Sequence, residues 1–159
     1  MIRKLMVSAF VLGLFAVPLH AAEKKISLPV EIEANEMEII DADKQAIFRG
    51  KVDAVRGDQH IKSDIMTVFY ADVKQPDGTS KSQASKLDAT GNVTITTKKQ
   101  TITGDWAKMD ILANTLLVGG GVKLVEGKTS LRGEKLTVDL STERTLMTGG
   151  RVKGSFVPK

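Results

Sequence analysis

The sequence contains no cysteine, only two histidines among 159 residues, and few aromatic side chains, which make up 4% of the chain. Without cysteine the chain has no disulfide, zinc knuckle, thiol nucleophile or iron–sulfur cluster. The missing disulfides leave the compartment open, because an oxidising space permits such bonds without requiring them. Few aromatic residues also provide few surfaces on which bases stack, so nucleic acid is not expected as a partner.

The chain is also poor in side chains that perform catalysis. Outside the first 22 residues His60 is the only histidine, which is too little for a Ser-His-Asp triad or a multi-histidine metal site. The acidic pair in Asp41–Asp43 is typical of a solvated turn. Gly127–Thr129 looks like the end of a phosphate-binding loop, but the glycine that such a loop needs five positions earlier is absent. We therefore expect no catalytic residue, no metal and no cofactor.

The first 22 residues have the features of a secretory signal peptide. Arg3 and Lys4 precede an apolar run from Leu5 to Val17, and small residues follow, with cleavage expected after Ala21 or Ala22. The run is shorter than the roughly 20 residues that span a bilayer. Removal of residues 1–22 lowers the net charge from +4 to +2. We expect a cleaved signal peptide over 1–22, export from the cytoplasm, and one domain over 23–159.

A four-fold repeat runs through the rest of the chain. Each copy reads aliphatic, polar, small, then Asn, Asp or Glu, with an apolar residue two positions later. The copies begin at Ile32, Ile61, Ile102 and Leu131, so their starts are 29, 41 and 29 residues apart. The longer middle interval contains the polar stretch Gln75–Ser85, which predicts an enlarged loop. A fixed period in this range indicates stacked supersecondary units.

A glycine landmark falls late in each repeat, usually two residues before a valine. The four examples are Phe48–Val52, Ala89–Val93, Val118–Val122 and the one-residue-longer Thr148–Val152. Glycine tolerates positive φ, so each landmark predicts a sharp bend or bulge that leads into a new strand.

Apolar residues within the repeats recur at every second position, which is the pattern of half-buried strands. Val30, Ile32 and Ala34 alternate with polar residues, and Leu136, Val138 and Leu140 do the same. After the small residue of each repeat the apolar alternation shifts by one position, which reverses the buried face of the strand. Each unit must therefore bend or bulge there. We predict an all-β fold of repeated bent antiparallel strands. A parallel β-helix is the alternative, although its coils are usually shorter than 29 residues.

The interior and the ends both suggest a binding role. Medium-sized aliphatic residues and methionines dominate the apolar positions, which suits an interior that adapts to lipid chains, although a core filled by its own side chains has the same composition. No capping helix is visible at either end of the repeat array. The terminal strands are therefore expected to accept a strand from another copy or from a partner.

The chain resembles the OstA-like family of periplasmic lipopolysaccharide-transport bridge proteins. The resemblance rests on the order and spacing of Pro29–Asn35, Phe48–Val52, Ile61–Met66, Pro76–Gly78 and Ile102–Asp105. It covers nearly the whole chain after the signal peptide. It implies a β-jellyroll open at both ends that stacks head to tail between the two membranes. It also implies lipopolysaccharide as ligand, with the inner-membrane clamp protein of a transport ATPase complex and the periplasmic domain of the outer-membrane translocon as partners.

The same resemblance implies a lipid-binding groove lined by inward-facing strand residues. By position these are Val30, Ile32, Ile95, Met109 and Ile111, and strand phase adds Val68 and Val138. Relatives have aromatic side chains at the position of Met109, which affects the expected width of the groove and not its apolar character. Basic residues could steer phosphorylated headgroups, namely Arg49, Lys51, Arg56, Lys123 and Arg132.

Two other functions remain open from the sequence. A periplasmic structural or adhesin-like repeat protein would have the same pattern with a closed, dry core. A carbohydrate-processing β-helix enzyme would need an acid–base pair of carboxyl groups, one of them in an apolar setting, which the sequence does not indicate.

Overall fold

The computed structural model describes residues 29–157 of the chain. The predicted signal peptide over 1–22 lies outside the described residues, as does the first part of the predicted domain, 23–28. The strands are β1 Glu31–Glu33, β2 Glu36–Ile40, β3 Gln45–Arg56, β4 Gln59–Lys74, β5 Ser80–Thr96, β6 Thr101–Asp110, β7 Thr115–Glu126, β8 Thr129–Asp139, β9 Arg144–Thr148 and β10 Lys153–Ser155. A single 3₁₀ turn, η1 Asp41–Asp43, joins β2 to β3. Within residues 29–157 no helix has the length and apolar character that crossing a membrane requires.

All these strands form one open sheet in which every recorded pair is antiparallel. Strands β3 to β8 are neighbours in chain order. At one end β1 and β2 both pair with β3, and at the other end β9 and β10 both pair with β8. The predicted all-β jellyroll of bent antiparallel strands, open at both ends, is confirmed, and the alternative of a parallel β-helix is wrong.

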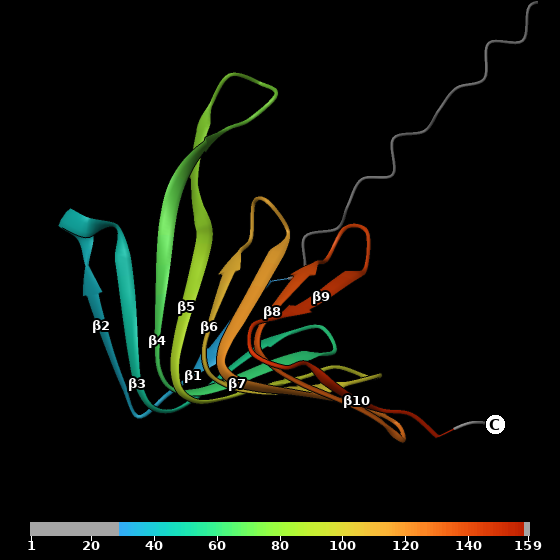
Figure 1. Ribbon diagram of the computed structural model, residues 1–159. Helices are drawn as coiled ribbons and strands as arrows, with labels where there is room; N and C mark the ends of the chain where they lie inside the picture. The colour runs from blue at the N-terminus through green and yellow to red at the C-terminus, as the bar shows by residue number, and fades with distance from the viewer. Residues whose placement is uncertain (1–28, 158–159) are drawn as a thin grey trace, which may run out of the picture.

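The sheet folds over itself because its long strands bend. Figure 1 shows an upright layer that contains β2 and β9, and a lower layer that contains β1 and β10, while β3 to β8 contribute to both. The register of neighbouring strands shifts at each bend, for example between Arg49 and Val52 in β3 and between Thr90 and Val93 in β5. We call this line of bends the crease.

The two sequence landmarks meet at the crease. Gly50, Gly91 and Gly120 have φ of 78°, 82° and 80°, which glycine adopts without strain. The Asn, Asp or Glu of each repeat packs against the glycine of the neighbouring strand: Asn35 against Gly50, Asp64 against Gly91, Asp105 against Gly120 and Glu134 against Gly149. The bends predicted from the glycines are therefore present, and the repeat's acidic or amide position is explained by this contact across strands.

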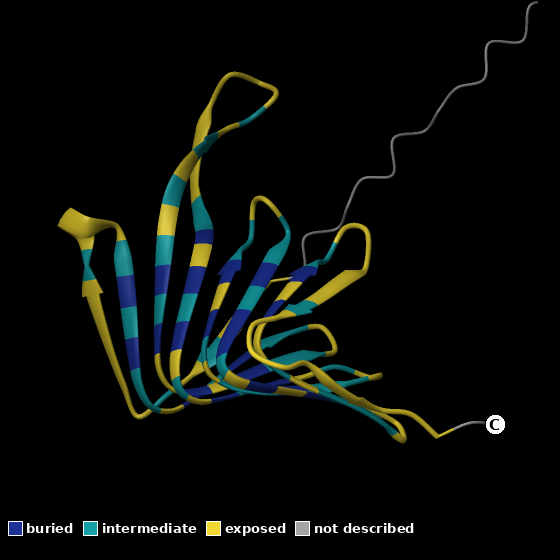
Figure 2. Ribbon diagram, viewed as in Figure 1, coloured by how far each residue is buried: buried dark blue, intermediate teal, exposed yellow. Residues whose placement is uncertain are grey.

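The core lies between the two layers. Alternate residues of each strand point inward, and Figure 2 shows them as stripes of buried residues across the central strands. The buried apolar residues extend from Ala46 in β3 to Val138 in β8, and Met66, Val118 and Leu136 are fully inaccessible to solvent. The period of two therefore places its apolar residues on one continuous inner surface.

The predicted loop over Gln75–Ser85 is wrong for most of its length. β4 continues to Lys74 and β5 begins at Ser80, so the extra residues form a longer hairpin that rises above its neighbours in Figure 1. We call residues 70–84 the β4–β5 arm. Its base is held by Tyr70 N–H donating to the Lys44 carbonyl at 2.8 Å and by Ile111 N–H donating to the Ser85 carbonyl at 2.8 Å. The backbone N–H and C=O groups of this polar hairpin are hydrogen-bonded between β4 and β5. The hairpin therefore forms without an apolar face.

Candidate functional site

The seven predicted groove residues all belong to the inner surface. Val68, Ile95, Met109 and Val138 are buried in the core, and Val30, Ile32 and Ile111 are half-buried against it. They come from elements that are distant in sequence, because the repeated bend brings every strand over the same interior. This placement fits a continuous apolar surface, and their contact with a lipid stays a prediction.

A cavity of about 270 Å³ opens on the side of the molecule opposite the crease. Its walls come from the segment entering β1, the end of β3, the base of the β4–β5 arm and the end of β6. The lining residues are Pro29, Val30, Ile32, Arg56, Val68, Tyr70, Gln83, Ala84, Leu87 and Ile111. We call this space the mouth. Its volume is just below the range of about 300–1,000 Å³ found for small-molecule pockets.

A smaller space lies next to the mouth. It has a volume of about 10 Å³, room for about one water molecule, and Val30, Ile61, Leu87, Met109 and Ile111 are among its walls. Val30 lies just before β1 at the end of the sheet, yet it shares this space with Met109 and Ile111, which come from the middle of the sheet. Pro29 and Val30, just before β1, therefore lie at the open side between the layers.

The predicted residues divide into two groups in this geometry. Val30, Ile32, Val68 and Ile111 line the mouth, and Met109 borders the smaller space. Ile95 and Val138 line neither space, and both are enclosed by the core at 4% and 5% exposure. Deep groove positions are therefore filled by the protein's own side chains in this conformation.

Several mouth residues were missed by the sequence reasoning. Leu87 has the same period of two as Ala89, so strand phase could have found it. Tyr70 lies beyond a register shift between Phe69 and Tyr70, which the apolar pattern does not reveal. Among the basic residues considered for steering, only Arg56 borders the mouth. Arg49 instead donates to Glu38 at 2.9 Å on the outer surface.

Electrostatics at the base of the arm stabilise its position. Lys44 Nζ donates to Asp72 Oδ2, and this hydrogen bond together with the positive charge holds the pKa of Asp72 below its ordinary value. Both side chains are more than half exposed, so solvent screens the pair and its contribution to stability is small. The arm is thus linked to β3 on one side and to the end of β6 on the other.

The inner surface continues to the first edge of the sheet. Met37 and Ile39 of β2 pair with the inward-facing Phe48 and Ala46 of β3, so they share the inner face. They nevertheless remain 60% and 62% exposed, because no further strand covers them. At the other edge Met147 of β9 pairs with the buried Leu136. Apolar side chains therefore reach both ends of the sheet.

The described residues offer little material for chemistry. No group of three or more His, Asp or Glu side chains within 29–157 is arranged to hold a metal ion. His60 Nδ1 lies 3.4 Å from Asp53 Oδ1 on the outer surface, away from the mouth. The site is an apolar space with a few polar groups at its rim, and it is suited to holding an apolar ligand.

Comparisons with known proteins agree with this geometry. A family model described as "LptA/(LptD N-terminal domain) LPS transport protein" matches residues 31–144. An uncharacterised protein of Rhizobium meliloti (strain 1021) is 28% identical over 134 residues, which are 82% of this chain and 72% of that protein. The crystal structure of LptH, "the LptA homologous periplasmic component of the conserved lipopolysaccharide transport device from Pseudomonas aeruginosa", superposes with a TM-score of 0.72. The match has 14% identity and covers 82% of this chain and 96% of that one.

Proposed function

The chain belongs to the LptA/(LptD N-terminal domain) LPS transport protein family, and we propose that it is a periplasmic carrier that holds the acyl chains of lipopolysaccharide between its two layers. The family is one of transport proteins, so the chain is not an enzyme. The observation that carries the proposal is the mouth, an apolar opening into an inner surface that runs through the whole sheet.

The physical basis is burial of hydrocarbon without specific polar contacts. Each methylene group removed from water contributes about 0.8 kcal/mol, so partial coverage of an acyl chain already supplies useful affinity. The mouth is where such a chain first finds apolar walls. Access to Ile95 and Val138 requires the two layers to separate, and the crease allows this because the opposite side carries no hydrogen bonds between layers among those recorded for residues 29–157.

A bridge between membranes needs more than one copy. We propose head-to-tail stacking, in which β1 and β2 of one copy extend the sheet that ends in β9 and β10 of another. Within residues 29–157 the outer edges of these four strands have no paired strand, and this together with the exposed Met37 and Ile39 supports the arrangement. The inner-membrane clamp protein and the periplasmic domain of the outer-membrane translocon would dock at the two ends in the same way. The direction of lipopolysaccharide transport then comes from energy that another component of the system supplies.

The carrier is tested by photocrosslinking in cells that make lipopolysaccharide. A photoreactive residue at Ile32 or Met109 should label lipopolysaccharide, while the same residue at the outward-facing Glu31 or Lys108 should not. Equal labelling from all four positions would contradict a groove. Labelling from none would favour the alternative of a structural or adhesin-like repeat protein with a closed core.

The substitution Ile32→Asp separates binding from folding. Ile32 is half-buried and lines the mouth, so a carboxylate there is tolerated at the rim but disrupts the apolar wall. We expect lipid labelling from Met109 to fall by about tenfold or more, while the free energy of unfolding drops by about 1 kcal/mol. Equal loss of labelling and folded protein would remove the support for a groove.

A further inference from the structure

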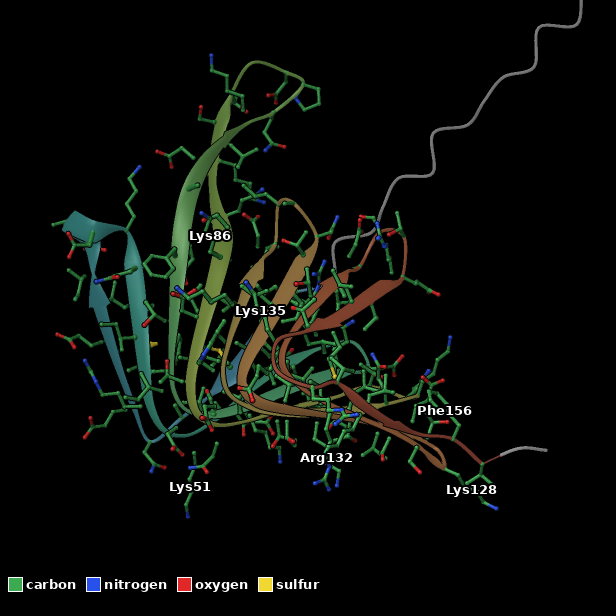
Figure 3. All side chains as sticks on the ribbon, in the orientation of Figure 1. Lys51, Lys86, Lys128, Arg132, Lys135 and Phe156 are labelled. Carbon is green, nitrogen blue, oxygen red and sulfur yellow. The ribbon has the colours of Figure 1, made fainter. Side chains whose placement is uncertain are left out.

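One row of outward-facing side chains crosses the whole lower layer. Cross-strand neighbours define it, one residue from each strand, and all point away from the interior. The row reads, in order, Glu33, Asp53, Lys62, Thr94, Thr103, Lys123, Arg132 and Lys153. It therefore begins with two acids at the β1 edge and ends with three bases at the β10 edge. Figure 3 shows Arg132 pointing away from the underside of this layer.

Both ends of the row place like charges side by side. Glu33 is directly opposite Asp53, and Arg132 lies between Lys123 and Lys153. Like charges at opposed positions of a sheet are destabilising. Asp53 is approached from β4 by two side chains, with Lys62 Nζ 3.5 Å from its Oδ2 and His60 Nδ1 3.4 Å from its Oδ1, yet Oδ1 accepts no hydrogen bond among residues 29–157. Glu33, on the other side of Asp53, still faces a carboxylate. An isolated copy therefore carries unfavourable charge contacts at both edges.

The charge imbalance extends to both layers of each end. Residues 29–43, which form β1, β2 and η1, contain six acidic side chains and no Lys or Arg. Residues 144–157, which form β9 and β10, contain Arg144, Arg151 and Lys153 and no Asp or Glu. The ends of the sheet are thus opposite in sign.

Backbone pairing alone does not fix how two copies meet. β1 and β2 run opposite to β3, and β9 and β10 run opposite to β8, so placing the first edge beside the last edge continues the antiparallel alternation. Two identical edges related by a two-fold axis would also be antiparallel. Charge distinguishes the two arrangements, because only unlike ends bring acids beside bases.

We infer that the charges at the two ends determine the polarity of assembly: the acidic β1–β2 edge accepts the basic β9–β10 edge of a second copy, and like edges repel each other. This inference rests on the proposed head-to-tail stacking, and it adds that the charge difference between the two edges enforces that stacking. A second copy supplies what each edge lacks, since its β10 lies beside β1 and brings Lys153 towards Glu33, with Asp53 one strand further in. Assembly is then sensitive to salt, which screens exposed charges over about 10 Å at 0.1 M.

The test uses two charge reversals that relieve contacts within the chain. Glu31→Lys with Glu33→Lys places a base opposite Asp53, and Arg151→Glu with Lys153→Glu places an acid opposite Arg132. Both variants should fold with thermal midpoints no lower than that of the unchanged protein. Sedimentation velocity at low salt should nevertheless show self-association weakened by about tenfold or more for each variant alone.

An equimolar mixture of the two variants provides the decisive result. Each variant then finds complementary edges on the other, so the mixture should recover the association of the unchanged protein. Lys74→Glu with Lys81→Glu is the matched control, because it changes two exposed charges on the central strands β4 and β5 that lie opposite the uncharged Ser80 and Val73, and it should leave association unchanged. Unchanged association of the single variants, or no recovery in the mixture, would overturn the inference, as would a protein that stays monomeric at every concentration.

This experiment is separable from the test of the carrier. If lipid labelling from Ile32 persists while charge reversal has no effect on association, the carrier stands and the charge rule is wrong. If reversal and mixing behave as expected while no lipid labelling occurs, the charge rule stands and the carrier is wrong.

Discussion

The two halves of the interior are built from the same repeat, yet one half is filled and the other is partly empty. Around β7 and β8, Val118, Val122 and Leu136 are at most 1% exposed. Around β1 and the base of the β4–β5 arm, the mouth leaves about 270 Å³ between aliphatic side chains, with Arg56, Tyr70 and Gln83 also in its walls. The aliphatic residues are of the same kind in both halves, so they do not explain the empty space.

The difference follows from how the layers end. The lower layer ends in a three-residue strand at both edges, β1 and β10, but beside the mouth β4 and β5 of the upright layer extend into the arm, so the two layers are unequal in length there. In the other half, β7 and β8 extend 12 and 11 residues across the crease and pair with each other on both sides of it. Room for a ligand in this fold therefore depends on mismatched layers more than on the identity of the apolar residues.

The largest expected effect is on stability in the filled half. Leu136→Ala removes side-chain atoms from a site with no solvent access, so a cavity remains, and we expect about 3 kcal/mol less free energy of unfolding. Ile111→Ala removes atoms that already border the mouth, and we expect about 1 kcal/mol. Urea denaturation monitored by circular dichroism measures both. Equal losses would show that the mouth is as well packed as the rest and would remove the contrast.

Adding a methyl group at a glycine of the crease should cause an intermediate loss of stability, and the loss should differ between the two halves. A Cβ at Gly120 would lie 2.5 Å from the Cβ of Asp105, which belongs to a strand paired on both sides. A Cβ at Gly50 would meet the Asn35 side chain at 2.6 Å, in the short link between β1 and β2 at the edge. We expect Gly120→Ala to cost about 2–3 kcal/mol and Gly50→Ala about 1–2 kcal/mol.

A control variant isolates backbone strain from the steric contact. Gly121 follows Gly120 with φ of 68°, and Asn92 follows Gly91 with φ of 47°, so asparagine is accepted at this position of the crease. Gly121→Asn should therefore change the free energy of unfolding by less than about 0.5 kcal/mol. If Gly50→Ala and Gly120→Ala cost the same in urea denaturation, the crease is equally rigid at the edge and in the middle.

Sequence patterns predicted the elements whose physical basis is local. A period of two, a repeated glycine and a phase slip each depend on a few neighbouring residues, and they correctly placed the bent strands and the inward direction of Val68 and Val138. The arm was missed because Ser80–Gln83 carries polar side chains on both faces. A strand with no apolar face has no apolar period, so its pairing with β4 leaves no mark in the sequence.

The division between empty and filled space was beyond sequence reasoning for a different reason. It depends on long-range packing, such as the contact region that Val30 shares with Met109 and Ile111, and on the unequal lengths of the two layers. Ile95 and Ile111 have the same chemistry and the same strand phase, yet only Ile111 lines the mouth. Composition identifies an apolar interior, but only the register of all strands together determines where it is open.

The smallest expected effect concerns the turns at the rim of each half. Asp139 Oδ1 accepts hydrogen bonds from the backbone N–H groups of Thr142 at 3.0 Å and Ser141 at 2.9 Å, and these lower the pKa of Asp139 below 3.8. Asp77 in the turn of the arm accepts from the hydroxyl and N–H of Thr79, which likewise lower its pKa. A lowered carboxyl pKa adds stability that is present above the ordinary value of 3.8 and is lost as the pH falls through the lower folded-state value.

The two turns should respond differently because they adjoin different packing. Asp139→Ala should lower the thermal midpoint slightly at about pH 7, and the difference from the unchanged protein should disappear as the pH falls through the lowered pKa of Asp139. Asp77→Ala should leave the midpoint unchanged, because the arm extends beyond the packed layers, and should only speed amide hydrogen exchange within residues 70–84. A midpoint lowered equally by both variants would mean that the arm unfolds together with the core, and the emptier half would then be as cooperative as the filled one.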